Sequence, residues 1–107
     1  MSESKLQAKI LNYLKEMGYW TIKVTVANKK GIMDIIACEP VTGLFIGIEV
    51  KWGTNKPSEL QSYNIREIKK RGGKAFVAWS LEDVKEGLLN GYRQDGTEEQ
   101  AEQKPRL

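Results

Sequence analysis

The sequence predicts an α/β domain of mixed α+β type, in which a mixed four-stranded sheet is flanked by helices in the order α-β-β-β-α-β-α. Segments with helical spacing of apolar residues alternate with short runs rich in β-branched residues. Short turns join the first three predicted strands, which favours an antiparallel meander, and a helix precedes the fourth, which allows a parallel crossover. With 107 residues the chain is long enough for one such domain and too short for two.

The N-terminal half contains one predicted helix and three predicted strands. Apolar residues recur at helical spacing over residues 3–17, and Gly18 follows where a left-handed cap would end the helix. Residues 20–26 alternate apolar with polar side chains, as a half-buried strand does. The next strands are expected over residues 33–39, which are almost continuously apolar, and over residues 44–52.

The C-terminal half contains two more predicted helices and one strand. Ser58 and Gln61 have the spacing of a capping box, which predicts a helix that begins there and ends at Arg71. Residues 74–79 form the fourth predicted strand, and the last helix is expected over residues 80–90.

Composition divides the chain into two parts. Residues 1–93 are expected to form the domain, and residues 94–107 a polar, disordered tail, because apolar residues become rare there. The domain carries 15 basic and 10 acidic side chains, whereas the tail carries 2 basic and 4 acidic ones. A moderately basic domain suits contact with phosphates, although this charge also fits proteins that bind no nucleic acid.

Several classes of protein are excluded by what the sequence lacks. No run of apolar residues is long enough to span a bilayer and the N-terminus has no signal-peptide pattern, so we expect a cytoplasmic protein without membrane contact. Cys38 is the sole cysteine, which excludes an intrachain disulfide and a cysteine-based zinc site. The absence of histidine removes histidine-dependent triads and acid-base pairs, so any catalysis must use carboxylates, lysine and metal.

Glu49 and Lys51 give the strongest local indication of chemistry. Because side chains alternate across a strand, both point to one face of the third predicted strand, while Ile48 and Val50 point to the other. A carboxylate and an ammonium group are therefore expected side by side. On its own, such a pair also fits an exposed ion pair without a chemical role.

Asp34 gives the second indication, because it interrupts an otherwise apolar predicted strand. A buried carboxylate is costly unless it is paired, neutralised or bound to a metal. If neighbouring strands bring Asp34 and Glu49 together, they form a hard oxygen site suited to Mg²⁺ or Mn²⁺. Such an ion would activate water and stabilise charge on a phosphate, with Lys51 orienting the water or binding the phosphate. The alternative for Asp34 is a turn or strand-start residue.

Gln61 and Glu3 are two further candidates, and each has a structural alternative. Gln61 has the position of the Ser58 partner in a helix cap. Glu3 lies in the first turn of the N-terminal helix, where a negative charge favours the helix dipole.

In this order the motifs resemble the nuclease core called VRR-NUC, a branch of the PD-(D/E)XK superfamily. The motifs that carry the resemblance are residues 31–34, residues 48–51, Gln61, the helix with Glu3 and Gln7, and the strand at residues 73–77. Together they cover about residues 3–80. Met33 departs from the pattern, because the name of the superfamily leads one to expect proline before the aspartate.

The resemblance implies a restriction-endonuclease-like core and divalent-metal-dependent cleavage of phosphodiester bonds in DNA. By matching position, Asp34 and Glu49 would be metal ligands, the carbonyl of Val50 a third ligand, and Lys51 the catalytic lysine. Glu3 and Gln61 would support catalysis. Stand-alone proteins of this size resemble phage and bacterial members that act as homodimers on branched DNA, such as four-way junctions, in repair or recombination.

Basic residues near these motifs are candidates for substrate binding. Lys29 and Lys30 precede Asp34, and Lys56 follows Lys51, so all three are expected to hold a DNA backbone. Trp52 is assigned to the core, with stacking on a base as the alternative.

The sequence therefore predicts a structure-selective DNA endonuclease. Two alternatives stay open: a non-catalytic DNA-binding or interaction module with a nuclease-like fold, and a nuclease for single strands or RNA.

Overall fold

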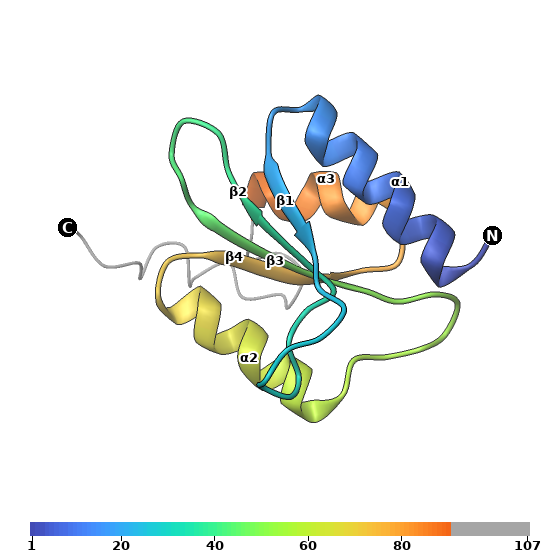
Figure 1. Ribbon diagram of the computed structural model, residues 1–107. Helices are drawn as coiled ribbons and strands as arrows, with labels where there is room; N and C mark the ends of the chain where they lie inside the picture. The colour runs from blue at the N-terminus through green and yellow to red at the C-terminus, as the bar shows by residue number, and fades with distance from the viewer. Residues whose placement is uncertain (91–107) are drawn as a thin grey trace.

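Seven elements follow one another in the predicted order α-β-β-β-α-β-α in the computed structural model, which describes residues 1–90 (Figure 1). They are α1 (Glu3–Glu16), β1 (Trp20–Lys23), β2 (Ile35–Cys38), β3 (Phe45–Val50), α2 (Glu59–Lys70), β4 (Lys74–Ala78) and α3 (Leu81–Asn90). The predicted boundary at residue 93 and the predicted tail lie outside the described residues. None of the described helices is both long and apolar enough to cross a bilayer.

The four strands form one mixed sheet in the order β1-β2-β3-β4. β2 pairs with β1 and β3 in antiparallel fashion, and β4 pairs with β3 in parallel after the crossover through α2. The predicted meander and crossover are therefore confirmed. β3 lies between an antiparallel and a parallel neighbour, at the centre of the sheet's hydrogen bonding.

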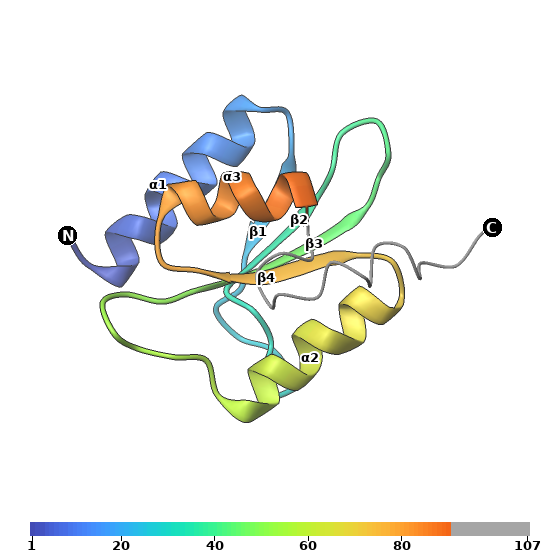
Figure 2. The ribbon, with the colours of Figure 1, turned by 180° about the vertical axis from the view of Figure 1, so that it is seen from behind.

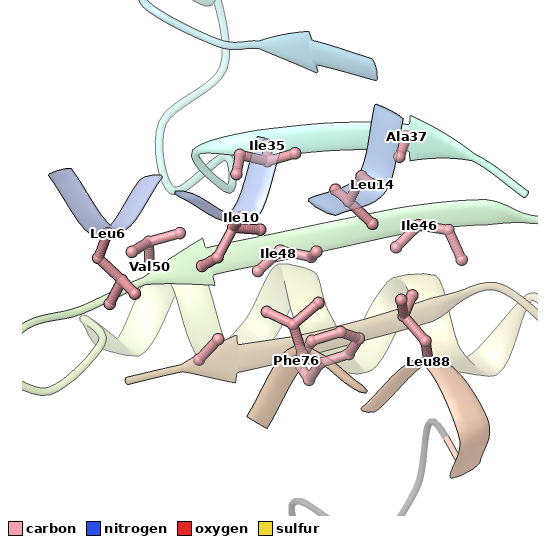
Figure 3. Close-up of a cluster of buried hydrophobic side chains, with 12 residues drawn as sticks. Leu6, Ile10, Leu14, Ile35, Ala37, Ile46, Ile48, Val50, Phe76 and Leu88 are labelled. Carbon is pink, nitrogen blue, oxygen red and sulfur yellow. The ribbon is translucent and has the colours of Figure 1, made fainter. Parts of the chain in front are cut away.

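Helices cover both faces of the sheet. α1 and α3 lie on one face, and α2 lies on the other, as the two opposite views show (Figures 1 and 2). On the α1 and α3 face, side chains of β3 pack with residues of both helices and of β4 in the main hydrophobic core (Figure 3). A smaller core on the α2 face contains Met33, Ile65 and Ala75. Strand alternation therefore gives β3 one wholly apolar face and leaves its other face for different side chains.

All four strands are shorter than predicted, and β4 is shorter by one residue, because it ends at Ala78 rather than at residue 79. β1 ends at Lys23 rather than at residue 26, β2 begins at Ile35 rather than at residue 33, and β3 ends at Val50 rather than at residue 52. β1 is one of the two edge strands, so within the described chain it has a pairing partner on one side. The sites predicted at Asp34 and Lys51 consequently lie just outside regular strand, each one residue beyond a strand end.

Candidate active site

The sheet register brings Asp34 and Glu49 together. Ile35 pairs with Ile48, so continuing the antiparallel register by one residue sets Asp34 beside Glu49. Both residues alternate with core residues and therefore face α2. The Asp34 carboxylate also accepts a hydrogen bond from the main-chain N–H of Val50, with 2.9 Å between Val50 N and Asp34 Oδ2. The two carboxylates that the sequence placed on neighbouring strands are thus neighbours in space.

Glu49 is the most deeply buried carboxylate of this group, with 1% of its surface exposed. Its Oε2 accepts a hydrogen bond from Gln61 Nε2 at 2.8 Å and lies 3.2 Å from Lys51 Nζ. Its Oε1 is buried and has no hydrogen-bond partner among residues 1–90. A buried oxygen without a donor is costly, which marks Oε1 as the atom of this site that is suited to a further ligand.

The surroundings of Glu49 raise the pKa of its carboxyl group to about 7. Burial is the largest cause, and the negative charge of Asp34 adds to it. Hydrogen bonding and charge from Lys51, together with the hydrogen bond from Gln61, act in the opposite direction without cancelling the increase. A cation at this place would favour the ionised form of Glu49.

Lys51 extends from the end of β3 on the same side as Glu49, as strand alternation predicted. Its side chain is 19% exposed, so the ammonium group lies between the buried carboxylate and solvent. Its main-chain N–H donates to the Ala78 carbonyl at 3.0 Å, which continues the pairing with β4 by one residue. Lys51 is therefore held at both its backbone and its ammonium group.

Gln61 completes the helix cap of α2 and also contacts Glu49, whereas its part in catalysis stays a prediction. Its main-chain N–H donates to Ser58 Oγ, and its side-chain oxygen accepts from the main-chain N–H of Ser58, which completes the capping box of α2. Its side-chain nitrogen donates to Glu49. The helix cap and the contact with the candidate site are made by the same amide group.

Asn64 is a functional candidate that the sequence did not reveal. It is buried, and its side-chain nitrogen donates to the carbonyl oxygens of Lys30 at 3.2 Å and Gly31 at 3.0 Å. It thereby ties the loop before Asp34 to α2. The available signal was a polar residue three positions after Gln61, on the same side of the helix.

Gly31 allows this loop to approach α2 closely. Its φ angle of 77° lies in the left-handed region. A Cβ atom there would also lie 2.6 Å from Leu60 Cγ and 2.9 Å from Asn64 Nδ2. Both backbone and space therefore require glycine at this position.

The predicted DNA-binding lysines lie on the two loops that end or begin at the site. Lys29 and Lys30 are exposed in the loop that leads to Asp34, and Lys56 is exposed in the loop that follows Lys51. The second loop is tied to the end of β4, since Trp79 Nε1 donates to the Asn55 carbonyl at 2.8 Å.

Two sequence assignments fit the structure less well. Trp52, which the sequence assigns to the core, is 39% exposed, because the chain leaves the sheet at Lys51 and enters a loop. Glu3 lies in the first turn of α1, and no hydrogen bond or ion pair joins its side chain to another described residue. Leu6 of the same turn packs in the core with Val50 (Figure 3), so α1 begins near the end of β3. A catalytic role of Glu3 stays a prediction.

The donors at this site fit a hard divalent cation. Among residues 1–90 no group of three or more histidine, cysteine, aspartate or glutamate side chains could hold a metal. The protein ligands would therefore be the two carboxylates and a main-chain carbonyl, for which Val50 is the predicted donor. Oxygen ligands with water and phosphate completing the coordination suit Mg²⁺ or Mn²⁺. The buried Oε1 of Glu49, which has no partner in the described part of the chain, supports this fit.

Comparison with solved structures identifies the fold. The chain is similar to a structure described as a VRR_NUC domain, with a TM-score of 0.70 and 24% identity over 84% of this chain and 97% of that one. It is also similar to Hjc of Archaeoglobus fulgidus, a Holliday junction resolvase, with a TM-score of 0.55 and 22% identity over 72% of this chain and 67% of that one. No family model matches the sequence, and no curated protein matches it. The chain thus has the fold of the VRR_NUC domain, as its motifs indicated.

Proposed function

We propose that this protein is a divalent-metal-dependent endonuclease that hydrolyses phosphodiester bonds in branched DNA. The observation that carries the proposal is the environment of Glu49, a buried carboxylate beside Asp34 with one oxygen unpartnered among the described residues. Lys51 and Gln61 hold the other oxygen. A protein that merely bound DNA would have no use for this costly arrangement.

Each residue has a distinct part in the proposed reaction. Asp34 and Glu49 hold Mg²⁺ or Mn²⁺ through their carboxylates, with the Val50 carbonyl as a third protein ligand. The bound ion would lower the pKa of an attacking water and stabilise the charge that grows on the phosphate. Lys51 orients the water or binds the phosphate from its position between Glu49 and solvent. Gln61 fixes the Glu49 carboxylate, and Glu3 is a supporting candidate from the first turn of α1.

The choice of branched DNA rests on the likeness to Hjc, which is described as a Holliday junction resolvase. Lys29, Lys30 and Lys56 add positive charge on the two loops that join the site, where phosphates on either side of a cleaved bond would lie. Action as a homodimer, with two sites for two strands, follows from the family resemblance. Light scattering of the purified protein tests the dimer separately.

Cleavage assays test the proposal directly. The full chain is incubated with Mg²⁺ or Mn²⁺ and with labelled four-way junctions, flaps, linear duplexes, single strands and RNA. Asp34→Ala, Glu49→Ala and Lys51→Met are expected to abolish cleavage. Lys70→Met is the matched control, because Lys70 also pairs with a glutamate, Glu67, at 3.1 Å.

Each other outcome points to a different function. If all three site variants cleaved DNA as fast as the parent, the assignment of the active site would be wrong. DNA binding without cleavage and without calorimetric Mn²⁺ binding would favour the non-catalytic module. Preference for single strands or RNA would overturn the choice of substrate.

A further inference from the structure

We infer that Ser58 is a positioning residue of the candidate active site. As the N-cap of α2, it fixes the side-chain amide of Gln61 so that the nitrogen faces Glu49. This holds one oxygen of Glu49 and leaves the other for the metal. The metal part of this inference rests on the proposed function, whereas the orientation of Gln61 does not.

Three hydrogen bonds form a continuous path from the helix cap to the carboxylate. The Ser58 N–H donates to Gln61 Oε1 at 2.9 Å, and the Gln61 N–H donates to Ser58 Oγ at 3.1 Å. Gln61 Nε2 then donates to Glu49 Oε2 at 2.8 Å. Gln61 is therefore the single residue that connects the N-cap Ser58 with the buried carboxylate of Glu49.

The chemistry of the amide allows one orientation. Its oxygen can only accept and its nitrogen can only donate. The Ser58 N–H requires an acceptor, and the Glu49 carboxylate requires a donor. A rotated amide would set two acceptors against each other at Glu49 and two donors against each other at Ser58. Both neighbours thus select the same orientation.

This orientation determines which Glu49 oxygen remains for a ligand. Gln61 and Lys51 both engage Oε2, while Oε1 is buried without a partner in the described chain. A disordered Gln61 amide would let the carboxylate rotate and would weaken this preorganisation. Outer hydrogen-bond partners of metal ligands commonly act in this way.

The requirement also explains why position 61 is glutamine. A capping box accepts glutamate or glutamine at this position. Glutamate would present a second negative charge to the Glu49 carboxylate, whereas glutamine caps the helix and donates at the same time. The donor function, not the cap, selects the amide.

The experiment compares two helix caps. Ser58→Ala removes the Ser58 Oγ bond to Gln61 N at 3.1 Å, and Ser80→Ala removes the equivalent bond to Asp83 N, also at 3.1 Å, at the start of α3. Both variants should lower the urea midpoint of unfolding similarly. Ser58→Ala should also weaken Mn²⁺ binding about tenfold by calorimetry, with Ser80→Ala unchanged. Ser58→Thr, which keeps a capping hydroxyl, should restore the affinity.

A further variant isolates the main-chain donor. Ser58→Pro also removes the N–H that holds Gln61 Oε1, and the Ser58 φ angle of −71° suits proline. It should weaken Mn²⁺ binding more than Ser58→Ala does. If the parent binds Mn²⁺, equal Mn²⁺ affinities of Ser58→Ala, Ser80→Ala and the parent would show that Ser58 is only a helix cap and would overturn the inference.

NMR of the metal-free protein separates this inference from the proposed function. The two side-chain amide protons of Gln61 should have distinct, protected signals in the parent and in Ser80→Ala, and these signals should shift and exchange faster in Ser58→Ala. If the parent bound no Mn²⁺ but these changes appeared, the positioning of Gln61 would stand and the proposed function would fail. Unchanged Gln61 signals in Ser58→Ala and Ser58→Pro would overturn the inference.

Discussion

Asp34 and Val50 are joined across the β2–β3 hairpin by a hydrogen bond from a main-chain N–H to a carboxylate, although they are 16 residues apart in the chain. The bond satisfies one oxygen of Asp34 and fixes the carboxylate beside Glu49. Asp34 consequently has a structural contact in addition to its proposed part as a metal ligand. A substitution that keeps the hydrogen bond but removes the charge can distinguish these two roles.

Asp34→Asn should retain the hydrogen bond and remove the charge. An asparagine oxygen can still accept from Val50, so the free energy of unfolding should change by about 1 kcal/mol or less. Mn²⁺ affinity should fall at least about tenfold, since an anionic ligand is removed. Urea unfolding and calorimetry measure the two effects. Asp34→Ala is the comparison, because it should reduce both stability and metal binding. Parental Mn²⁺ affinity in Asp34→Asn would contradict the ligand assignment.

Glu49 should make the metal-free protein less stable as the pH rises. Its pKa is about 7 in the folded chain against an ordinary value of 4.5, so the folded state binds the proton more tightly. The resulting stabilisation is fully present below pH 4.5 and is lost as the pH rises through 7. The shift corresponds to about 3 kcal/mol at most. Urea unfolding between pH 5 and pH 8.5 with a metal chelator measures it.

Glu49→Gln should remove this pH dependence and be more stable than the parent at pH 8.5. Glu39→Gln is the control. Burial raises the pKa of Glu39, but hydrogen bonds from Thr42 and Lys74 outweigh it and hold that pKa below its ordinary value. Its stabilisation is therefore present at high pH and lost as the pH falls, so Glu39→Gln should leave the loss of stability near pH 7 in place. If Glu49→Gln lost stability near pH 7 as the parent does, a group other than Glu49 would be responsible for this pH dependence.

Gly31→Ala should destabilise the fold through both strain and collision. Gly53 provides a matched control, because its φ angle of 67° is also left-handed but a Cβ there meets no atom within 4 Å. Gly53→Ala should cost about 1 kcal/mol of unfolding free energy for the backbone strain alone. Gly31→Ala should cost roughly 2 kcal/mol more, because the new methyl group meets Leu60. Similar urea midpoints of the two variants would show that the loop can move away from α2.

Lys29, Lys30 and Lys56 should contribute to DNA affinity through phosphates. Replacing each by alanine should weaken binding and make the dependence of log K on log salt shallower by roughly one for each phosphate that is no longer neutralised. Fluorescence anisotropy at several salt concentrations measures both quantities. Lys85→Ala is the control, because Lys85 belongs to α3 and lies over the ring of Tyr13. α3 covers the sheet face opposite to α2 (Figure 2). An equal effect of Lys85 would indicate nonspecific attraction.

The sequence predicted the element order and the shared face of Glu49 and Lys51 because these follow from local periodicity. It did not determine the ends of the strands or the exposure of Trp52, since these depend on where pairing partners are present. Asn64 was missed for a related reason. Its hydrogen bonds join residues 33 and 34 positions apart, and no local pattern records such a contact.

Because side chains alternate across β3, a single strand register places both the core residues and the residues of the candidate site. A shift of the β2–β3 register by one residue would turn Glu49 toward α1 and α3, and would turn Ile48 and Val50 toward α2. Such a slipped hairpin would place the Glu49 carboxylate in the apolar core and would also lose the apolar packing of β3. Molecules with the shifted register would therefore be unstable as well as inactive. The apolar packing of one face of β3 thus selects the register that also brings the polar side chains of the other face together.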